Sequence, residues 1–336
     1  MSWISTGDRA QTFHMYQRSA EVKTEMLRLT SELSSGRKSD LGKALGGDFA
    51  GLAAVERGLR LGLVYKAAAD EAALHTSVMQ DALQTVQTQL DETGPTLLAA
   101  VGAGWSSNLG ILAVDSGARL DLVVNALNGR IAGRSLFSGD RPDQIPLISG
   151  DEMLANLGPL VAGAATAQDM IAIVEDWFLA PGGGFETTAY RGGTSSAAGF
   201  TVGDGDVIDA DVSALAPEIR GALAAFALSA LVGNDLGPAD EASQRTLLEA
   251  AATRMIGSQG GLSKIRAELG AAEARIETAR VRNSATETAL SIEHNRLVRA
   301  DPYTTATELE AVQMQLESLF VLTSRMARLN LTEFLR

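Results

Sequence analysis

The residues of this chain that could do chemistry are few and far apart. Its three histidines are His14, His75 and His294, and each stands alone within a helical pattern. A catalytic site needs titratable side chains that converge in one pocket, and this spacing brings none together. The absence of cysteine excludes thiol catalysis, disulfides and cysteine-based zinc sites. We therefore expect no enzyme activity and no cofactor, and we interpret each histidine as a surface or interface residue.

Two polar stretches come nearest to ligand-binding motifs. "GRKSDLGK" (residues 36–43) resembles a phosphate loop, but its glycines are one residue too far apart, and Ala44 stands where Ser or Thr should bind magnesium. "GDGDVIDAD" lacks the ligand order and the terminal glutamate of a calcium-binding EF-hand. Its aspartates are Asp204, Asp206, Asp209 and Asp211. We predict a solvated acidic turn there and no metal site.

Amphipathic helices at the two ends of the chain follow the same repeat. Apolar positions alternate at spacings of three and four residues, which is the pattern of helices that supercoil around each other. A lone amphipathic surface helix at each end is the plainer alternative, but two matched patterns favour pairing of the ends. The predicted assembly interface comprises Met15, Val22, Met26, Leu29, Leu33, Leu309, Val312, Leu316, Leu319 and Met326.

Further helical patterns lie between these ends. A long helix is expected from residue 51 to residue 92, with a stop at Gly94-Pro95. Its counterpart covers residues 265–299 and ends before Asp301-Pro302. Shorter helices are expected over residues 111–127 and 246–257.

The glycine-rich middle of the chain has a different pattern. Strands are expected over residues 185–190, 199–202 and 207–208, between helical segments within 152–178 and 217–232. Residues 130–240 carry 5 arginines, no lysine and 15 acidic residues. The predicted fold class is therefore mainly α: a long antiparallel helical rod with paired N- and C-terminal coiled-coil helices and a small, acidic α+β insert.

Charge and hydropathy exclude several classes of partner. A net charge of −13 argues against nucleic acid and against an anionic membrane surface. No run of 18 apolar residues is present, and the N-terminus lacks the pattern of a secretory signal peptide.

Residues 28–60 resemble the N-terminal signature of bacterial flagellins. In that family a helix leads into Leu-x-Ser/Thr-Gly-x-Lys/Arg, and after a loop Ala-Gly-Leu-Ala opens a second helix. The matching residues are Leu33, Ser35, Gly36, Arg37, Asp40, Ala50, Gly51, Leu52 and Ala53. The loop differs in having "LGGDF" where an Asp-Asp pair is usual. Residues 301–336 resemble the terminal helix of the same family, so both ends match in the expected order.

Two shorter stretches point to one family within the flagellin superfamily. "LNGRIAGRSLFSGDR" (residues 127–141) and "TAYRGG" (residues 188–193) are similar to segments of hook-associated protein 3, the family that joins hook to filament. The resemblance implies a structural subunit of the flagellar axial structure at this junction, with flagellin itself as the alternative. A soluble coiled-coil interaction protein is the hypothesis from outside the superfamily.

The resemblance also implies the domains, partners and location. The domains expected are an axial-core helix and loop (1–44), the first half of the rod (45–130), an outward-facing insert (131–240), the second half of the rod (241–300) and a C-terminal axial-core helix (301–336). The partners expected are further copies of the chain, neighbouring hook-associated and flagellin subunits, and an export chaperone on the C-terminal helix. The protein is expected outside the cell, exported without a cleaved signal peptide.

Overall fold

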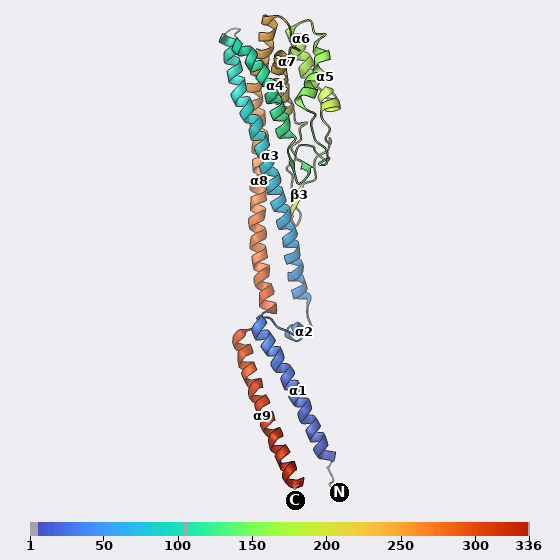
Figure 1. The fold of residues 1–336 in the computed structure, drawn as a ribbon, viewed down its shortest axis with the longest axis vertical. Helices are drawn as coiled ribbons and strands as arrows, with labels where there is room; N and C mark the ends of the chain where they lie inside the picture. The colour runs from blue at the N-terminus through green and yellow to red at the C-terminus, as the bar shows by residue number, and fades with distance from the viewer. Residues whose placement is uncertain (1–5, 104–106, 335–336) are drawn as a thin grey trace. The chain divides into compact units, whose positions relative to one another are not determined.

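The computed structural model describes the backbone of residues 6–103 and 107–334, and their side chains except at residues 6–9, 11–12, 107–108 and 326–334. The chain forms two compact units. Unit 1 consists of residues 1–62 and 285–336, and unit 2 of residues 63–284. Figure 1 shows the elements of both units in chain order.

Unit 1 is built around the two terminal helices. Helix α1 (Thr6–Ser35) and helix α9 (Pro302–Phe334) lie side by side and antiparallel (Figure 1). The short helix α2 (Leu41–Ala44) follows α1. Unit 1 also contains residues 50–62 of α3 (Ala50–Ala103) and residues 285–298 of α8 (Glu241–Val298). The predicted pairing of the N- and C-terminal helices is confirmed.

Helix α3 does not stop at Gly94-Pro95, so that prediction is wrong. Proline lacks the N–H that a helix needs, and inside a helix it costs about 3 kcal/mol. Burial of Leu90 and Leu97 on either side of the proline offsets that cost, because both side chains are fully inside the core. Gly94 also lets α8 come close, since a Cβ there would lie 3.1 Å from Cβ of Met255. Tertiary packing therefore carries the helix on to Ala103.

Helix α8 is a single helix where the sequence predicted two. Residues 257–265 contain three glycines, yet this stretch remains helical. Met255, Leu262 and Ile265 are buried on both sides of the glycines and hold this stretch in the core. A Cβ at Gly261 would lie 2.7 Å from Cγ of Glu218, so this glycine admits a close neighbour from helix α7 (Pro217–Gly233).

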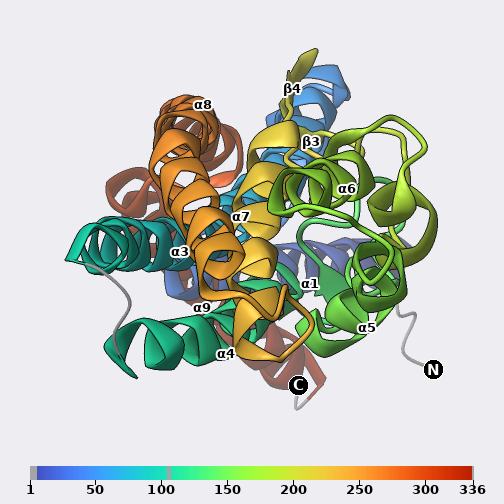
Figure 2. The same cartoon turned by 90° about the horizontal axis from the view of Figure 1, so that it is seen from above.

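Unit 2 packs the insert around one buried helix. Helix α7 (Pro217–Gly233) is buried along almost its whole length and packs against α4 (Ser107–Leu127) and α6 (Ala167–Leu179). Figure 2 shows α7 between α8 and α6. Helix α5 (Gly150–Val161) packs beside α6. The Ser116 and Ser229 hydroxyls, 2.7 Å apart, form a hydrogen bond between α4 and α7 that satisfies both in the core.

The strands of unit 2 are short and antiparallel. Strand β1 (Arg130–Ile131) pairs with β2 (Arg134–Ser135), and β3 (Phe200–Gly203) pairs with β4 (Asp206–Ile208). The last two correspond to the strands expected at residues 199–202 and 207–208. The predicted fold class, mainly α with long antiparallel helices and a small α+β insert, is confirmed.

The strand expected at residues 185–190 is wrong. Residues Phe185–Ala189 form a π-helical turn, η1, and only Tyr190 makes a β-bridge, to Leu147. The hydroxyl of Thr187 donates to the carbonyl oxygen of Gly183 at 3.0 Å, which favours the helical turn. Phe185 is fully buried and contacts Trp177 and Phe178. Its apolar character reflects this aromatic cluster rather than a strand.

Candidate assembly surface

Most of the predicted assembly residues lie between α1 and α9 of the same chain. Val22 and Leu29 are buried, and Met15 and Met26 are half-buried. On α9 the half-buried residues are Leu309, Val312, Leu316 and Leu319. The repeat therefore describes an intramolecular seam. The side chain of Met326 lies outside the described residues.

Leu33 does not belong to this seam. Its side chain is 40% exposed, whereas that of the preceding Glu32 is buried. A carboxylate thus occupies the position that spacing assigned to a leucine. A pattern of apolar residues misses Glu32, because such a pattern cannot recognise a charged residue as part of a buried face.

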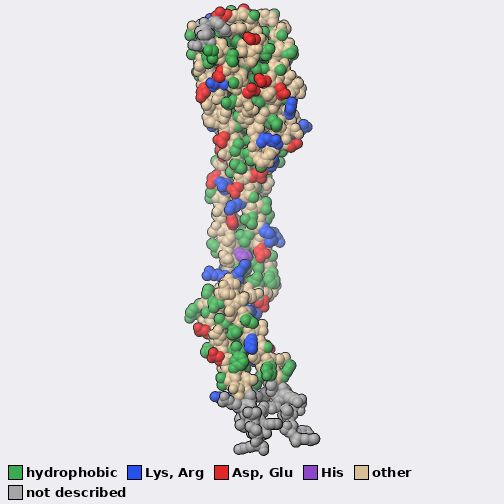
Figure 3. Space-filling model, in the orientation of Figure 1, with side chains coloured by type: hydrophobic (Ala, Val, Ile, Leu, Met, Phe, Trp, Pro, Cys, Tyr) green, Lys and Arg blue, Asp and Glu red, His purple; other side chains and the backbone are tan. Residues whose placement is uncertain are grey.

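A second set of apolar side chains faces outward from the helix pair. On α1 these are Phe13, Tyr16, Leu27 and Leu33, and on α9 they are Tyr303, Met314, Phe320, Val321 and Leu322. Figure 3 shows hydrophobic side chains interspersed over the region of α1 and α9. We name these nine residues the outer face. Many exposed apolar side chains on one pair of helices are a feature of surfaces that contact other proteins. In the sequence, this surface corresponds to the apolar residues of the two terminal helices that do not lie in the seam.

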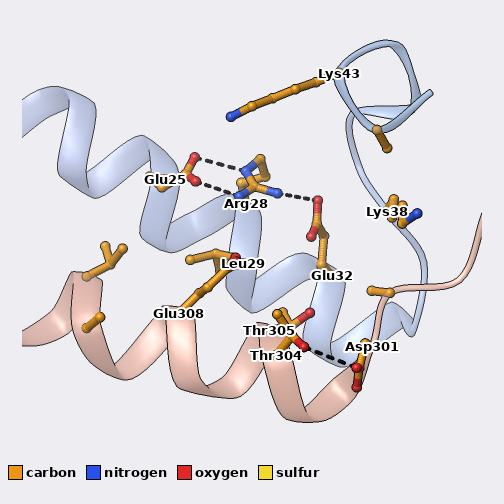
Figure 4. Close-up of a pocket in the computed structure, with 14 residues that line it drawn as sticks. Glu25, Arg28, Leu29, Glu32, Lys38, Lys43, Asp301, Thr304, Thr305 and Glu308 are labelled. Atoms are coloured by element: carbon orange, nitrogen blue, oxygen red, sulfur yellow. Dashed lines mark hydrogen bonds and ion pairs between the residues drawn. The ribbon is translucent and has the colours of Figure 1, made fainter. Parts of the chain in front are cut away.

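Glu32 ties α1 to the loop that follows it. Its Oε1 accepts hydrogen bonds from Nη1 of Arg28 at 2.6 Å and from the backbone N–H of Ser39 at 2.9 Å. Arg28 also binds the carboxylate of Glu25, and this hydrogen bond lowers the pKa of Glu25. Figure 4 shows Arg28 between the two glutamates. This network holds the end of α1 and the loop in one arrangement.

The residues of the flagellin-like signature form the loop and its two flanking helix ends. Ser35 ends α1, and Gly36 adopts a positive φ of 67°, a conformation that suits glycine at a helix C-terminus. The Asp40 carboxylate caps α2 by accepting from the backbone N–H of Lys43 at 2.9 Å. Ala50 opens α3, two residues before buried Leu52. Gly51 is exposed, and a Cβ there would meet nothing within 4 Å.

The loop after α1 pairs with the connection between α8 and α9. Arg37 and Arg299 form an antiparallel β-bridge. The backbone N–H of Lys38 donates to the carbonyl oxygen of Val298 at 2.9 Å, and that of Ala300 donates to Gly36 at 3.0 Å. We call residues 36–38 and 298–300 the joint. The sequence does not reveal this pairing, because nothing local indicates which distant loop a short extended segment will meet.

Beside the joint lies an open groove of about 620 Å³. Its wall includes Glu25, Arg28, Glu32 and Lys43 on one side and Asp301 and Glu308 on the other (Figure 4). The Asp301 carboxylate is engaged locally, since it accepts from the backbone N–H of Tyr303 at 3.0 Å and from the hydroxyl of Thr304 at 3.1 Å. Cations and anions alternate around this groove, so it does not present the uniform charge of a phosphate site.

The acidic turn of unit 2 is engaged with arginine. Asp206 forms an ion pair with Arg282 at 2.7 Å and lies 4.0 Å from Arg275, both on α8. The hairpin β3–β4 buries Val202 and Ile208 against a small alanine-rich cluster of α3 and α8. The predicted solvated turn is thus partly a docking contact for the hairpin. No group of three or more His, Asp or Glu side chains able to hold a metal is present in the described residues.

The three histidines are dispersed. His14 is exposed on α1, and His294 is half-buried on α8. His75, on α3, packs against Phe200 with ring centroids 5.5 Å apart and ring planes inclined at 58°. Burial, together with the nearby guanidinium of Arg134, lowers the pKa of His75. None of the described helices is long and apolar enough to cross a membrane.

Comparison with known proteins shows which of them this chain resembles. Residues 254–335 match the family model of the bacterial flagellin C-terminal helical region. The structure is similar to FlgL of Bacillus cereus, with a TM-score of 0.51 and 16% sequence identity over 70% of this chain and 96% of that chain. It is also similar to a protein of Vibrio parahaemolyticus assigned as flagellar hook-associated, with a TM-score of 0.52 and 14% identity over 73% and 95% of the two chains. No curated protein sequence matches. The predicted resemblance to flagellins is confirmed for the C-terminal region, residues 254–335.

Proposed function

We propose that this chain, which has a flagellin-type C-terminal region and a fold shared with FlgL, is a structural subunit of the bacterial flagellar axial structure. It polymerises through its terminal helices and connects the hook to the filament. The observation that carries this proposal is the outer face of α1 and α9, nine apolar residues that remain exposed on this pair of helices. Such a surface needs neighbouring subunits to bury it.

The energetics of the helix pair favour assembly coupled to ordering. Two helices share one seam, in which only a few side chains are fully buried. Most helix stability in proteins comes from packing an apolar face, so a pair with a second face exposed gains stability when neighbours cover it. Contacts between unlike surfaces of identical subunits that do not close into a ring build a helical tube. A short stack of such subunits would join two tubes.

The partners proposed follow from this position. Further copies of the chain, hook-associated subunits and flagellin subunits would cover the outer face in the assembled structure. Before assembly, an export chaperone would bind the exposed apolar side chains of α9. The protein would act outside the cell, after export without a cleaved signal peptide. No enzymatic role is proposed, because the titratable groups of the described residues are engaged in ion pairs and helix caps or dispersed.

Immunogold labelling of isolated flagella with antibody to unit 2 tests this function. Label confined to the point where hook meets filament supports the junction subunit. Label along the whole filament would identify the chain as a flagellin. Absence of label from flagella would overturn the axial role and favour a soluble coiled-coil protein.

A further inference from the structure

Two arginines face each other in the joint. The backbone hydrogen bonds from Lys38 and Ala300 flank Arg37 and Arg299, which makes these two a non-hydrogen-bonded pair of the bridge. In such a pair the Cα atoms are about 4.5 Å apart, and the side chains leave the same face close together. Both arginine side chains are exposed.

Arg299 attracts the neighbouring carboxylate of Asp301, because the pKa of that group is lowered first by the backbone N–H of Tyr303 and also by the positive charge of Arg299. Among the residues that the structure describes, neither the Arg37 nor the Arg299 side chain forms a hydrogen bond or an ion pair. The nearby Asp301 carboxylate is occupied by the backbone of Tyr303 and the hydroxyl of Thr304. Like charges directly opposite each other destabilise a β-pair. The arginine pair therefore does not stabilise the joint of the single chain.

We propose that Arg37 and Arg299 together form a docking site for carboxylate side chains on a neighbouring copy of this chain. The site rests on the proposed function, which supplies that neighbour. Guanidinium groups bind carboxylates through paired hydrogen bonds, and a rigid backbone bridge holds both donors in place. The surface of a second copy is rich in the required groups, because the chain carries 41 acidic against 28 basic residues. Charge complementarity thus favours a second copy as the occupant.

The double variant Arg37→Gln/Arg299→Gln tests this site. If the arginine pair served only to stabilise the joint, the variant monomer would be less stable than the wild type. A docking role predicts a thermal midpoint that is unchanged or higher, because the repulsion across the bridge is gone, together with a loss of about tenfold in self-association measured by sedimentation. The control is Arg60→Gln, which changes an exposed arginine of the same unit and should leave self-association at the wild-type level.

A disulfide variant separates the bridge from its charges. The Cα separation of a non-hydrogen-bonded pair falls within the range that a disulfide spans. The two thiols of Arg37→Cys/Arg299→Cys should therefore form a disulfide within one chain. The native sequence contains no cysteine, so no other thiol can compete. The oxidised protein keeps the bridge and lacks both charges, so it should self-associate as weakly as the glutamine variant. Wild-type self-association by the oxidised protein would overturn the proposal.

The two assays distinguish this proposal from the proposed function. Immunogold labelling of flagella tests the axial role, and sedimentation of the purified chain tests the arginine pair. If the purified wild-type chain does not self-associate and the arginines matter only for incorporation among other flagellar subunits, the occupant is not a second copy and the proposal fails. A decline of wild-type self-association with added salt, much weaker in the glutamine variant, supports it.

Discussion

Glu32 is the clearest case of one residue holding a local structure. Its carboxylate is buried and joins the Arg28 guanidinium to the Ser39 N–H. Glu32→Ala removes the hydrogen bonds that this carboxylate accepts, and a hydrogen bond to a charged group contributes about 1.5–3 kcal/mol. We expect the free energy of unfolding of unit 1 to fall by this amount in urea titrations followed by circular dichroism. Glu310→Ala, at an exposed site on α9, should change it by less than about 0.5 kcal/mol. Equal effects would show that the Glu32 network contributes no stability.

His75 should make the stability of unit 2 depend on pH. Its pKa is lowered in the folded chain by burial and by Arg134, with Glu71 opposing, so folding favours the neutral ring. The stability that comes from this neutral ring is complete above the unfolded pKa of about 6.5 and is lost as pH falls through that value toward the lower folded pKa. We expect the wild type to lose more unfolding free energy than His75→Phe between about pH 7.5 and 5.5. His14→Phe, at an exposed site, is the control and should retain the wild-type pH dependence.

At the scale of the element, α3 shows packing that overrides local preference. Gly94 and Gly62 lie in the same helix, but only Gly94 has a neighbour where a Cβ would stand. Gly62→Ala should raise the unfolding free energy by about 0.5–1 kcal/mol, the usual gain from replacing glycine inside a helix. Gly94→Ala should show a smaller gain or a loss, because its Cβ must displace Met255 and Ile256. If thermal unfolding gave equal increases in unfolding free energy for both variants, α8 would have to move away from Gly94 without an energetic cost.

At the scale of the whole molecule, the seam and the outer face should separate folding from assembly. Leu316→Asp places a charge between α1 and α9 and should weaken the helix pair as well as incorporation into flagella. Met314→Asp changes a side chain that is 61% exposed on the same helix, so the helical content of the monomer should remain. Its incorporation should nevertheless be lost, because neighbours would have to bury the carboxylate. Normal motility of cells carrying Met314→Asp would remove the outer face from the interface.

The sequence alone predicted what depends on local patterns. Heptad spacing from Met15 to Leu29 and from Leu309 to Leu319 indicated two helices with one apolar stripe each, and their match indicated the pair. Glycine and aspartate around residues 203–206 marked the β3–β4 hairpin. The flagellin-like signature located the loop after α1 through residues that act locally, such as the positive-φ Gly36 and the helix cap of Asp40.

Tertiary structure alone decided what depends on residues remote in the chain. Pro95 remains inside a helix because Leu90 and Leu97 are buried in a shared core. Arg37 meets Arg299 because backbone bonds join two loops that a local pattern cannot pair. Periodicity identifies an apolar side chain but not whether its own chain covers it. The division of the terminal repeats into a covered seam and an uncovered outer face therefore became visible only when α1 lay against α9.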